Sequence, residues 1–303
     1  DVDKMLRRAW KHLALGAASL LAAGSAMAAP VDGGIDFQPP VTETAKAVHA
    51  FHNEVLIIIS VIVVFVTGLL IYTILRYNQR ANKVPAKFTH NSPLEIAWTV
   101  VPILILVFIG SFSLPVLFKQ QEIPVADVTI KVTGNQWYWS YEYPDNGIAF
   151  DSYMIGSPAT GGTNQMTPDV EKQLVDAGYT KEQFLLATDT AVVVPVNKTV
   201  VMQVTAADVI HSWKIPAFGV MQDGVPGRLA HLWFKAEKEG VYFGQCSELC
   251  GARHAYMPIV VEALPPAQFA AWVKAKGGSM PGEKPAEAAP AADTTAAADT
   301  TKK

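Results

Sequence analysis

Residues 246–257 read Cys246-Ser-Glu-Leu-Cys-Gly-Ala-Arg-His-Ala-Tyr-Met257 and contain both cysteines of the 303-residue chain. The second half of this run has the spacing Cys-x3-His-x2-Met, which offers a thiolate, an imidazole and a thioether. This combination of ligands is typical of electron-transfer copper sites. A single copper needs one cysteine, whereas a second thiolate four residues upstream allows two sulfurs to bridge two metal ions. The run therefore predicts a dinuclear copper site.

Two alternatives exist for these cysteines. A disulfide between Cys246 and Cys250 suits an exported protein, but it closes a short loop and leaves the spacing of His254 and Met257 without a use. A zinc site with His211 is the other alternative, although zinc has no use for the thioether of Met257. Both alternatives account for fewer residues of the run than copper does.

Two long apolar segments, residues 55–75 and 96–118, contain no charged side chain. Each is long enough to span a bilayer. The intervening residues 76–95 carry four basic side chains against the single acid Glu95, and the positive-inside rule places such a loop in the cytoplasm. The sequence therefore predicts a hairpin of two transmembrane helices over residues 55–118.

The N-terminal residues have the order of a signal peptide. Basic residues after Met5 are followed by a short stretch of small apolar residues and an Ala-x-Ala site. We expect residues 1–28 to be removed, with 1–4 as an upstream extension, and residues 29–54 to lie in the periplasm. The chain is therefore predicted to reside in a bacterial inner membrane, with its N-terminus and its C-terminal domain on the periplasmic side.

Residues 119–265 have the texture of a β domain. Short β-branched or aromatic segments alternate with Gly, Pro and Asn, which is typical of a β-sandwich or Greek-key barrel. Residues 152–189 interrupt the series as an insertion. The expected strands are 127–133, 137–143, 191–196, 199–205, 229–234, 240–245 and 258–262.

The C-terminal part ends in a short helix, predicted over 266–276, and a tail of low complexity over 277–303 that we expect to be disordered. Residues 119–303 contain 20 acidic and 15 basic side chains, a net charge of −5. This charge argues against a nucleic-acid partner; it suits a basic protein partner, and it equally suits a surface charge that serves solubility.

A second histidine ligand is needed, and the β domain offers His211, His231 and His254. His211 follows a strand-like segment at an expected loop, which suits a ligand remote from the cysteine run. His231 lies in the middle of an expected strand, where we interpret it as a structural polar residue.

Four segments resemble subunit II of the haem-copper cytochrome c oxidase family. They are 205–216, 224–229, 240–258 and the aromatic stretch Gly134-Asn-Gln-Trp-Tyr-Trp-Ser-Tyr-Glu-Tyr-Pro-Asp145. The resemblance spans roughly residues 45–265. It implies a membrane-anchored all-β fold, in which an N-terminal two-helix transmembrane hairpin is followed by a cupredoxin-like Greek-key β-barrel.

The resemblance also implies a ligand set for the copper centre, which the family calls CuA. Two cysteines bridge the coppers, a histidine and the methionine complete one copper, and the second histidine and a backbone carbonyl complete the other. In this chain the matching residues are, in that order, Cys246, Cys250, His211, Met257, His254 and Glu248. The carboxylate of Glu248 is expected to reach a magnesium ion shared with the catalytic subunit.

Further roles follow from the same resemblance. Trp137 matches the exposed residue that receives the electron from cytochrome c, and Glu95 matches the mouth of a proton pathway, although it also suits the start of any helix. The candidate acids for docking cytochrome c are Glu142, Asp145, Asp208 and Asp223.

The implied function is that of subunit II of cytochrome c oxidase. Such a chain accepts electrons from cytochrome c and passes them to the haem-bearing subunit I, which reduces oxygen and translocates protons; subunit III is a further expected partner. One alternative is the CuA domain of a nitrous oxide reductase-like enzyme, which the two membrane spans disfavour. Another is a metal-free quinol oxidase subunit II, which the full ligand set disfavours.

Overall fold

The computed structural model describes residues 26–31 and 33–282. The predicted signal peptide lies outside the described residues except for its last three, Ala26–Ala28, which form the short strand β1. The predicted tail lies outside them from residue 283 onwards.

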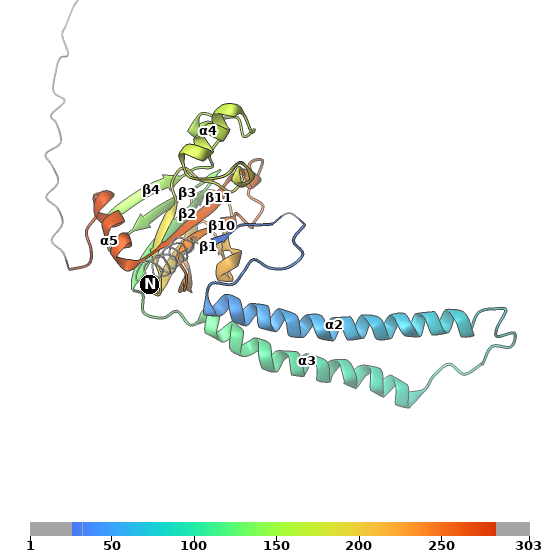
Figure 1. The fold of residues 1–303 in the computed structure, drawn as a ribbon. Coiled ribbons are helices and arrows are strands. Elements are labelled where there is room, and N and C mark those ends of the chain that lie inside the picture. Colours follow the sequence, from blue (N-terminus) through green and yellow to red (C-terminus); the bar gives the residue numbers. More distant parts are fainter. Residues whose placement is uncertain (1–25, 32, 283–303) are drawn as a thin grey trace, which may run out of the picture.

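Two long helices project from a β domain as a hairpin (Figure 1). They are α2 (Glu43–Arg76) and α3 (Ser92–Gln121), and they contain the two predicted apolar runs. The apolar windows of both helices are 0% buried within the chain, so their side chains need a cover of lipid or of other protein. Both helices are long and apolar enough to cross a membrane.

The hairpin is fastened to the β domain at the first turn of α2. Thr42 caps this helix by accepting a hydrogen bond from the amide of Ala45, and its hydroxyl donates to the carbonyl of Phe218 at 2.7 Å. Directly before the cap, the amide of Val41 donates to the carbonyl of Ala217 and the carbonyl of Val41 accepts from the amide of Glu237. The β domain therefore has a fixed position relative to the start of α2.

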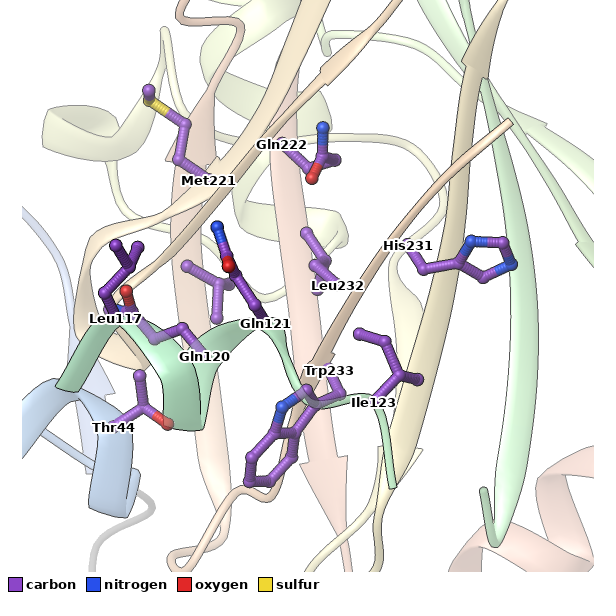
Figure 2. Close-up of a pocket in the computed structure, with 12 residues that line it drawn as sticks. Thr44, Leu117, Gln120, Gln121, Ile123, Met221, Gln222, His231, Leu232 and Trp233 are labelled. Atoms are coloured by element: carbon purple, nitrogen blue, oxygen red, sulfur yellow. The ribbon is translucent and has the colours of Figure 1, made fainter. Parts of the chain in front are cut away.

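A cavity of about 430 Å³ lies where the end of α3 meets the β domain (Figure 2). Leu117 and the amide side chains of Gln120 and Gln121 line it from α3, and Leu232 and Trp233 line it from the β domain. The junction between hairpin and β domain is therefore incompletely filled by this chain alone.

Two sheets and a two-stranded ribbon build the β domain. The sheet orders are β4-β3-β2-β6-β9, β1-β10-β11-β5 and β7-β8. Large aromatic side chains fill the space between the sheets, including the fully buried Trp139, Trp213 and Phe234. The strands after β1 are β2 (Val128–Asn135), β3 (Tyr138–Tyr143), β4 (Ile148–Ser152), β5 (Val192–Pro195), β6 (Val200–Ala206), β7 (His211–Ile215), β8 (Val220–Gly224), β9 (Ala230–Phe234), β10 (Gly240–Gln245) and β11 (Pro258–Leu264).

All seven expected strands are present, but β1, β4, β7 and β8 were not predicted. Strand β8 reads Val-Met-Gln-Asp-Gly and has little apolar alternation, because it pairs with β7 and not with either large sheet. His211 was expected in a loop and is instead the first residue of β7. His231 is exposed on β9, in agreement with its interpretation as a polar residue of the framework.

The insertion forms a small lobe with its own core. Helix α4 (Pro168–Asp176) is capped by Thr167, and the chain turns away at Gly178, whose φ is +83°. The lobe is held together by the buried side chains of Ile155, Val170, Leu174 and Ala187. Its short helical turns are η1 (Pro158–Thr160) and η2 (Lys181–Gln183).

The remaining helical segments flank the β domain. Turn η3 (Pro216–Phe218) follows β7, and turn η4 (His254–Tyr256) lies within the cysteine run. The predicted C-terminal helix is α5 (Pro266–Ala275), which buries Phe269 and Val273 against the β domain. In Figure 1, α4 lies on the side of the β domain that faces away from the helix hairpin.

Candidate metal centre

Three neighbouring strands position the cysteine run. Strands β10 and β11 pair antiparallel, and their last register pair, Gln245 with Pro258, closes the loop 246–257 at its base. Strand β7 crosses close to β10 because Gly244 has no side chain: a Cβ there would lie 1.9 Å from the carbonyl oxygen of Lys214. This close approach brings His211, at the start of β7, to the cysteine loop.

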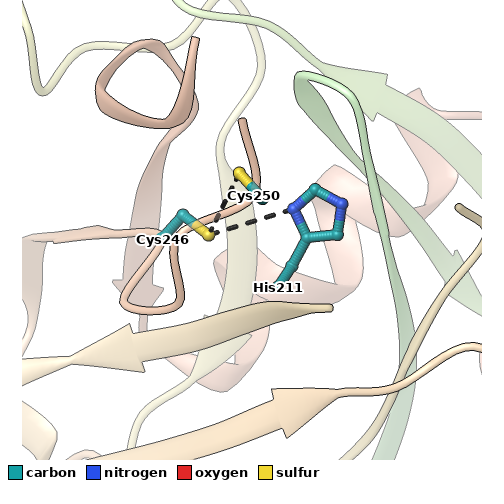
Figure 3. Close-up of side chains that lie close together, drawn as sticks. All are labelled: His211, Cys246 and Cys250. Carbon is teal, nitrogen blue, oxygen red and sulfur yellow. Dashed lines mark hydrogen bonds between the residues drawn. The ribbon is translucent and has the colours of Figure 1, made fainter. Parts of the chain in front are cut away.

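The two cysteines face each other without a bond. Their sulfurs are 3.9 Å apart, both side chains are buried, and both thiols are free. A disulfide needs a separation of about 2.05 Å, so this alternative does not describe the structure. Figure 3 shows both sulfurs beside the imidazole of His211. The donor atoms of His211, Cys246 and Cys250 all lie within 4.8 Å of one another.

The other expected ligand atoms surround this sulfur pair. The sulfur of Cys246 lies 3.9 Å from Nδ1 of His211 and 3.3 Å from the backbone carbonyl of Glu248. The sulfur of Cys250 lies 3.5 Å from Nδ1 of His254 and 3.5 Å from Sδ of Met257. The structure therefore brings all six predicted donors together. Which donors share one copper stays a prediction.

The imidazole of His211 is oriented by a hydrogen bond on the ring nitrogen that faces away from the cysteines. Its Nε2 lies 2.8 Å from Oδ1 of Asp208, and because a carboxylate only accepts, Nε2 donates and Nδ1 is left for a metal. Burial would raise the pKa of Asp208, but the hydrogen bond from His211 and the amides of Val209 and Gln136 lower it. A Cβ at Gly134 would lie 2.8 Å from the His211 ring, so only glycine leaves room for this orientation.

The two thiols differ in acidity. Burial alone would raise the pKa of Cys246, but the imidazole of His211 and the backbone amide of Ser212 outweigh it and lower that pKa. Burial and the neighbouring Cys246 raise the pKa of the Cys250 thiol. Cys246 therefore ionises first, and a metal ion must displace the proton of Cys250.

Comparison with known proteins identifies the family. Residues 128–264 match the family described as "Cytochrome C oxidase subunit II, periplasmic domain". Residues 30–116 match the description "Cytochrome C oxidase subunit II, transmembrane domain". The chain belongs to the cytochrome c oxidase subunit II family.

Individual proteins similar to this chain are also subunits II of cytochrome c oxidases. The chain is 63% identical to "Cytochrome c oxidase subunit 2" of Cereibacter sphaeroides over 276 residues, which cover 88% of this chain and 91% of the relative. It is 45% identical to "Probable cytochrome c oxidase subunit 2" of Rickettsia bellii over 248 residues, covering 82% and 86%. Among solved structures, the periplasmic domain of subunit II of the cytochrome oxidase of Bradyrhizobium japonicum is 46% identical; the match covers 51% of this chain and 96% of that domain, with a TM-score of 0.42.

Membership in the subunit II family confirms the predicted resemblance and the predicted fold of a helix hairpin followed by a β domain. The chain is anchored in the membrane by two spans and is a component of an oxidoreductase complex. The CuA-type copper of this family is consistent with the group of His211, Cys246 and Cys250. The identities favour subunit II over the nitrous oxide reductase and quinol oxidase alternatives.

Trp137 lies directly against the cysteine loop of this subunit II chain. Its indole Nε1 donates to the carbonyl of Cys250 at 3.2 Å, and its ring packs on Gly251, where a Cβ would approach to 3.1 Å. The guanidinium of Arg253 lies 5.7 Å from the ring centroid. The Trp137 side chain was expected to be exposed, but it is half-buried because these contacts cover one face of the ring.

The candidate docking acids do not form one cluster. Asp208 is occupied by His211, and Asp223 is exposed on β8, opposite Ser212 of β7. Glu142 pairs with Lys131, and Asp145 follows the far end of β3 from Trp137. Six residues of strand separate the two ends by about 20 Å. The structure therefore places Asp208 beside Trp137, but not Asp145.

Glu95, the predicted proton-pathway residue, belongs to α3 and not to the copper loop. Glu248, the predicted magnesium ligand, belongs to the copper loop. Glu95 is in the first turn of α3 and accepts a hydrogen bond from the amide of Asn91 at 3.1 Å. The Glu248 side chain is exposed while its backbone carbonyl faces Cys246. One residue can thus offer a carbonyl inward and a carboxylate outward.

Sequence reasoning missed the supporting residues of the centre. Asp208 orients His211, but it was predicted only as a docking acid. Gly134 and Gly244 leave the space that His211 and its strand need, and no role was predicted for them from the sequence. The Asp-x-x-His spacing of Asp208 and His211 was the available signal, since a metal-bound histidine usually donates its other N–H to a carboxylate.

Replacing Asp208 by alanine is expected to weaken copper binding by roughly 10- to 100-fold, because His211 loses the group that orients it. Competition with a copper chelator measures this change. Asp223→Ala, which removes an exposed acid from the neighbouring strand, serves as the matched control. Equal copper affinity of the Asp208 variant and the wild type would contradict the assigned role.

Proposed function

We propose that this subunit II chain receives electrons from cytochrome c at Trp137, holds them at a dinuclear CuA centre, and delivers them to the haem-bearing subunit I. In that complex oxygen reduction is coupled to proton translocation. The observation that carries the proposal is the gathering of two free, buried thiols and four further donor atoms within one loop and one strand end.

The donor set fits copper better than zinc. Thiolate, imidazole and thioether are the ligands that electron-transfer copper uses, and Met257 and the Glu248 carbonyl lie within 3.5 Å of the sulfurs. When bound, a sulfur-bridged copper pair shares one electron over two metals and so accepts and releases it with little rearrangement. The ligands proposed to hold it are His211, Cys246, the carbonyl of Glu248, Cys250, His254 and Met257.

The surrounding residues supply a rigid and dry setting. Trp139 is fully buried, donates to the carbonyl of Met257 at 3.2 Å, and stands edge-on to the His211 ring at 5.9 Å. Asp208 holds the opposite side of the same imidazole. Because His211 and Met257 are both held by partners outside the loop, the centre has little freedom to rearrange.

Electron uptake through Trp137 is supported by its contacts. The half-buried indole offers one face to a docked protein, while its Nε1 is hydrogen-bonded to the carbonyl of a cysteine ligand. The acidic net charge of residues 119–303 suits a basic cytochrome, and Asp208 accepts a hydrogen bond from the amide of Gln136, the residue before Trp137.

Trp137→Ala is expected to slow reduction of the copper centre by cytochrome c by at least about tenfold, while the copper spectrum is retained, because no proposed ligand is removed. Trp137→Phe keeps an aromatic ring but loses the N–H donor, so its reduction rate should lie between those of the wild type and of Trp137→Ala. Stopped-flow reduction at several cytochrome c concentrations measures the effect. Unchanged reduction of the alanine variant would argue against electron uptake at Trp137.

The remaining elements of the proposal concern the assembled oxidase. The exposed Glu248 carboxylate is suited to a magnesium ion shared with subunit I. The basic turn between α2 and α3 supports a cytoplasmic location for that turn and a periplasmic location for the β domain. Glu95 is proposed to mark a proton pathway into subunit I, and subunit III is a further proposed partner. Glu142, Asp145 and Asp223 remain proposed docking acids.

A further inference from the structure

Gln136, which lies between β2 and β3, bonds to two separate parts of the metal centre. Its backbone amide donates to Oδ2 of Asp208 at 2.7 Å. Its side-chain Nε2 donates to the carbonyl of Cys250 at 3.0 Å. One residue therefore links segments that lie 72 and 114 residues further along the chain.

Each of these two contacts leads directly to a proposed ligand. The other carboxylate oxygen of Asp208 accepts from His211 at 2.8 Å, so the main chain of Gln136 fixes the group that fixes the imidazole. The side chain reaches the backbone of Cys250 itself. Gln136 is thus connected to the histidine side and to the cysteine side of the centre.

The carbonyl of Cys250 accepts two N–H groups side by side. One comes from Gln136 at 3.0 Å and the other from the indole of Trp137 at 3.2 Å. A carbonyl oxygen has two lone pairs, so both bonds form at once. A Cβ at position 251 would lie 3.3 Å from the amide of Gln136 and 3.1 Å from the Trp137 ring, and Gly251 leaves this space open.

We propose that Gln136 is a positioning residue for electron transfer. Its side chain holds the Cys250 carbonyl and its main chain holds the Asp208–His211 pair. The adjacent indole is thereby kept at hydrogen-bonding distance from a cysteine ligand. The inference rests on the proposed function, in which the electron passes from Trp137 to the copper centre. It differs from a role as a docking contact, which the exposure of Gln136 would also permit.

Gln136→Met in the assembled oxidase tests this assignment. Methionine has a similar length and shape but no N–H donor, so the Cys250 carbonyl keeps only the indole. Gln222→Met removes the amide of a partly buried residue of β8, which donates to the backbone carbonyl of the neighbouring Asp223, and is the matched control. Two quantities are measured: stopped-flow reduction of the copper centre by reduced cytochrome c, and hydrogen–deuterium exchange of residues 134–138.

The expected result is a roughly three- to tenfold lower rate constant at saturating cytochrome c, with the half-saturating concentration unchanged. Exchange of residues 134–138 should become faster, and the copper spectrum should stay as in the wild type. The control variant should change neither quantity.

Two results would overturn the inference. A higher half-saturating concentration with an unchanged saturating rate would make Gln136 a docking contact. Unchanged exchange of residues 134–138 would mean that the side chain holds nothing in place. The wild-type reaction with cytochrome c tests the proposed function by itself: if it fails, the exchange measurement still decides whether Gln136 positions this segment.

Discussion

Replacing Cys250 by serine is expected to abolish the two-copper centre. Its sulfur lies within 3.9 Å of the Cys246 sulfur and within 3.5 Å of both His254 and Met257, so its loss removes the atom around which half of the donors gather. We expect at most one weakly bound copper. Reduction by cytochrome c should fall by more than about 100-fold, beyond the roughly 10- to 100-fold cost of losing an outer partner of a ligand.

Ser247→Ala provides the control for this substitution. Ser247 is an exposed residue of the same loop, and its side chain bonds only locally, to the carbonyl of Gln245. Copper content and the visible spectrum are measured on both variants. Two coppers with an unaltered spectrum in Cys250→Ser would show that this thiolate does not bridge the metals.

Gly244→Ala is expected to destabilise the copper domain although it replaces no proposed ligand. A Cβ at this position would lie 1.9 Å from the Lys214 carbonyl and 2.7 Å from Cδ1 of Ile215. Both are parts of β7, so the strand must move away from β10 and take His211 with it. The expected loss is about 3 kcal/mol or more of unfolding free energy, and the melting temperature should fall by roughly 6–12 °C.

Thermal unfolding of the purified full chain in detergent, followed by circular dichroism, measures this change. Gly110→Ala is the control, because a Cβ at this position of α3 meets nothing within 4 Å. A stable Gly244→Ala variant with full copper content would mean that β7 and β10 need not approach so closely.

The sequence predicted those parts of the molecule whose signals are local. Two uncharged runs of bilayer length are sufficient to predict α2 and α3, and the Cys-x3-His-x2-Met spacing places three ligands within one loop. Each of these features depends on neighbouring residues only.

Features that depend on distant residues were missed. Strands β7 and β8 pair with each other beside the two large sheets, and β8 has no apolar pattern of its own. Asp208 was assigned as a docking acid because of its charge. In the structure its carboxylate lies 2.8 Å from Nε2 of His211 and orients that imidazole. The requirement for Gly134 and Gly244 arises from side chains and carbonyls that only the folded chain brings near.

Trp137 illustrates the same limit. Three neighbouring rings of the aromatic stretch, Trp139, Tyr141 and Tyr143, are buried in the β domain. The contact of the Trp137 indole with Cys250, 113 residues away, has no counterpart in local sequence. That contact turns a partly exposed aromatic residue into a direct neighbour of the metal centre.

Electron paramagnetic resonance of the purified, copper-loaded chain tests the central claim most directly. Two free thiols with four further donors around them predict two coppers per chain and a hyperfine pattern in which one electron is shared equally by two copper nuclei. The pattern of a single copper nucleus, or a stoichiometry of one copper per chain, would contradict the dinuclear centre.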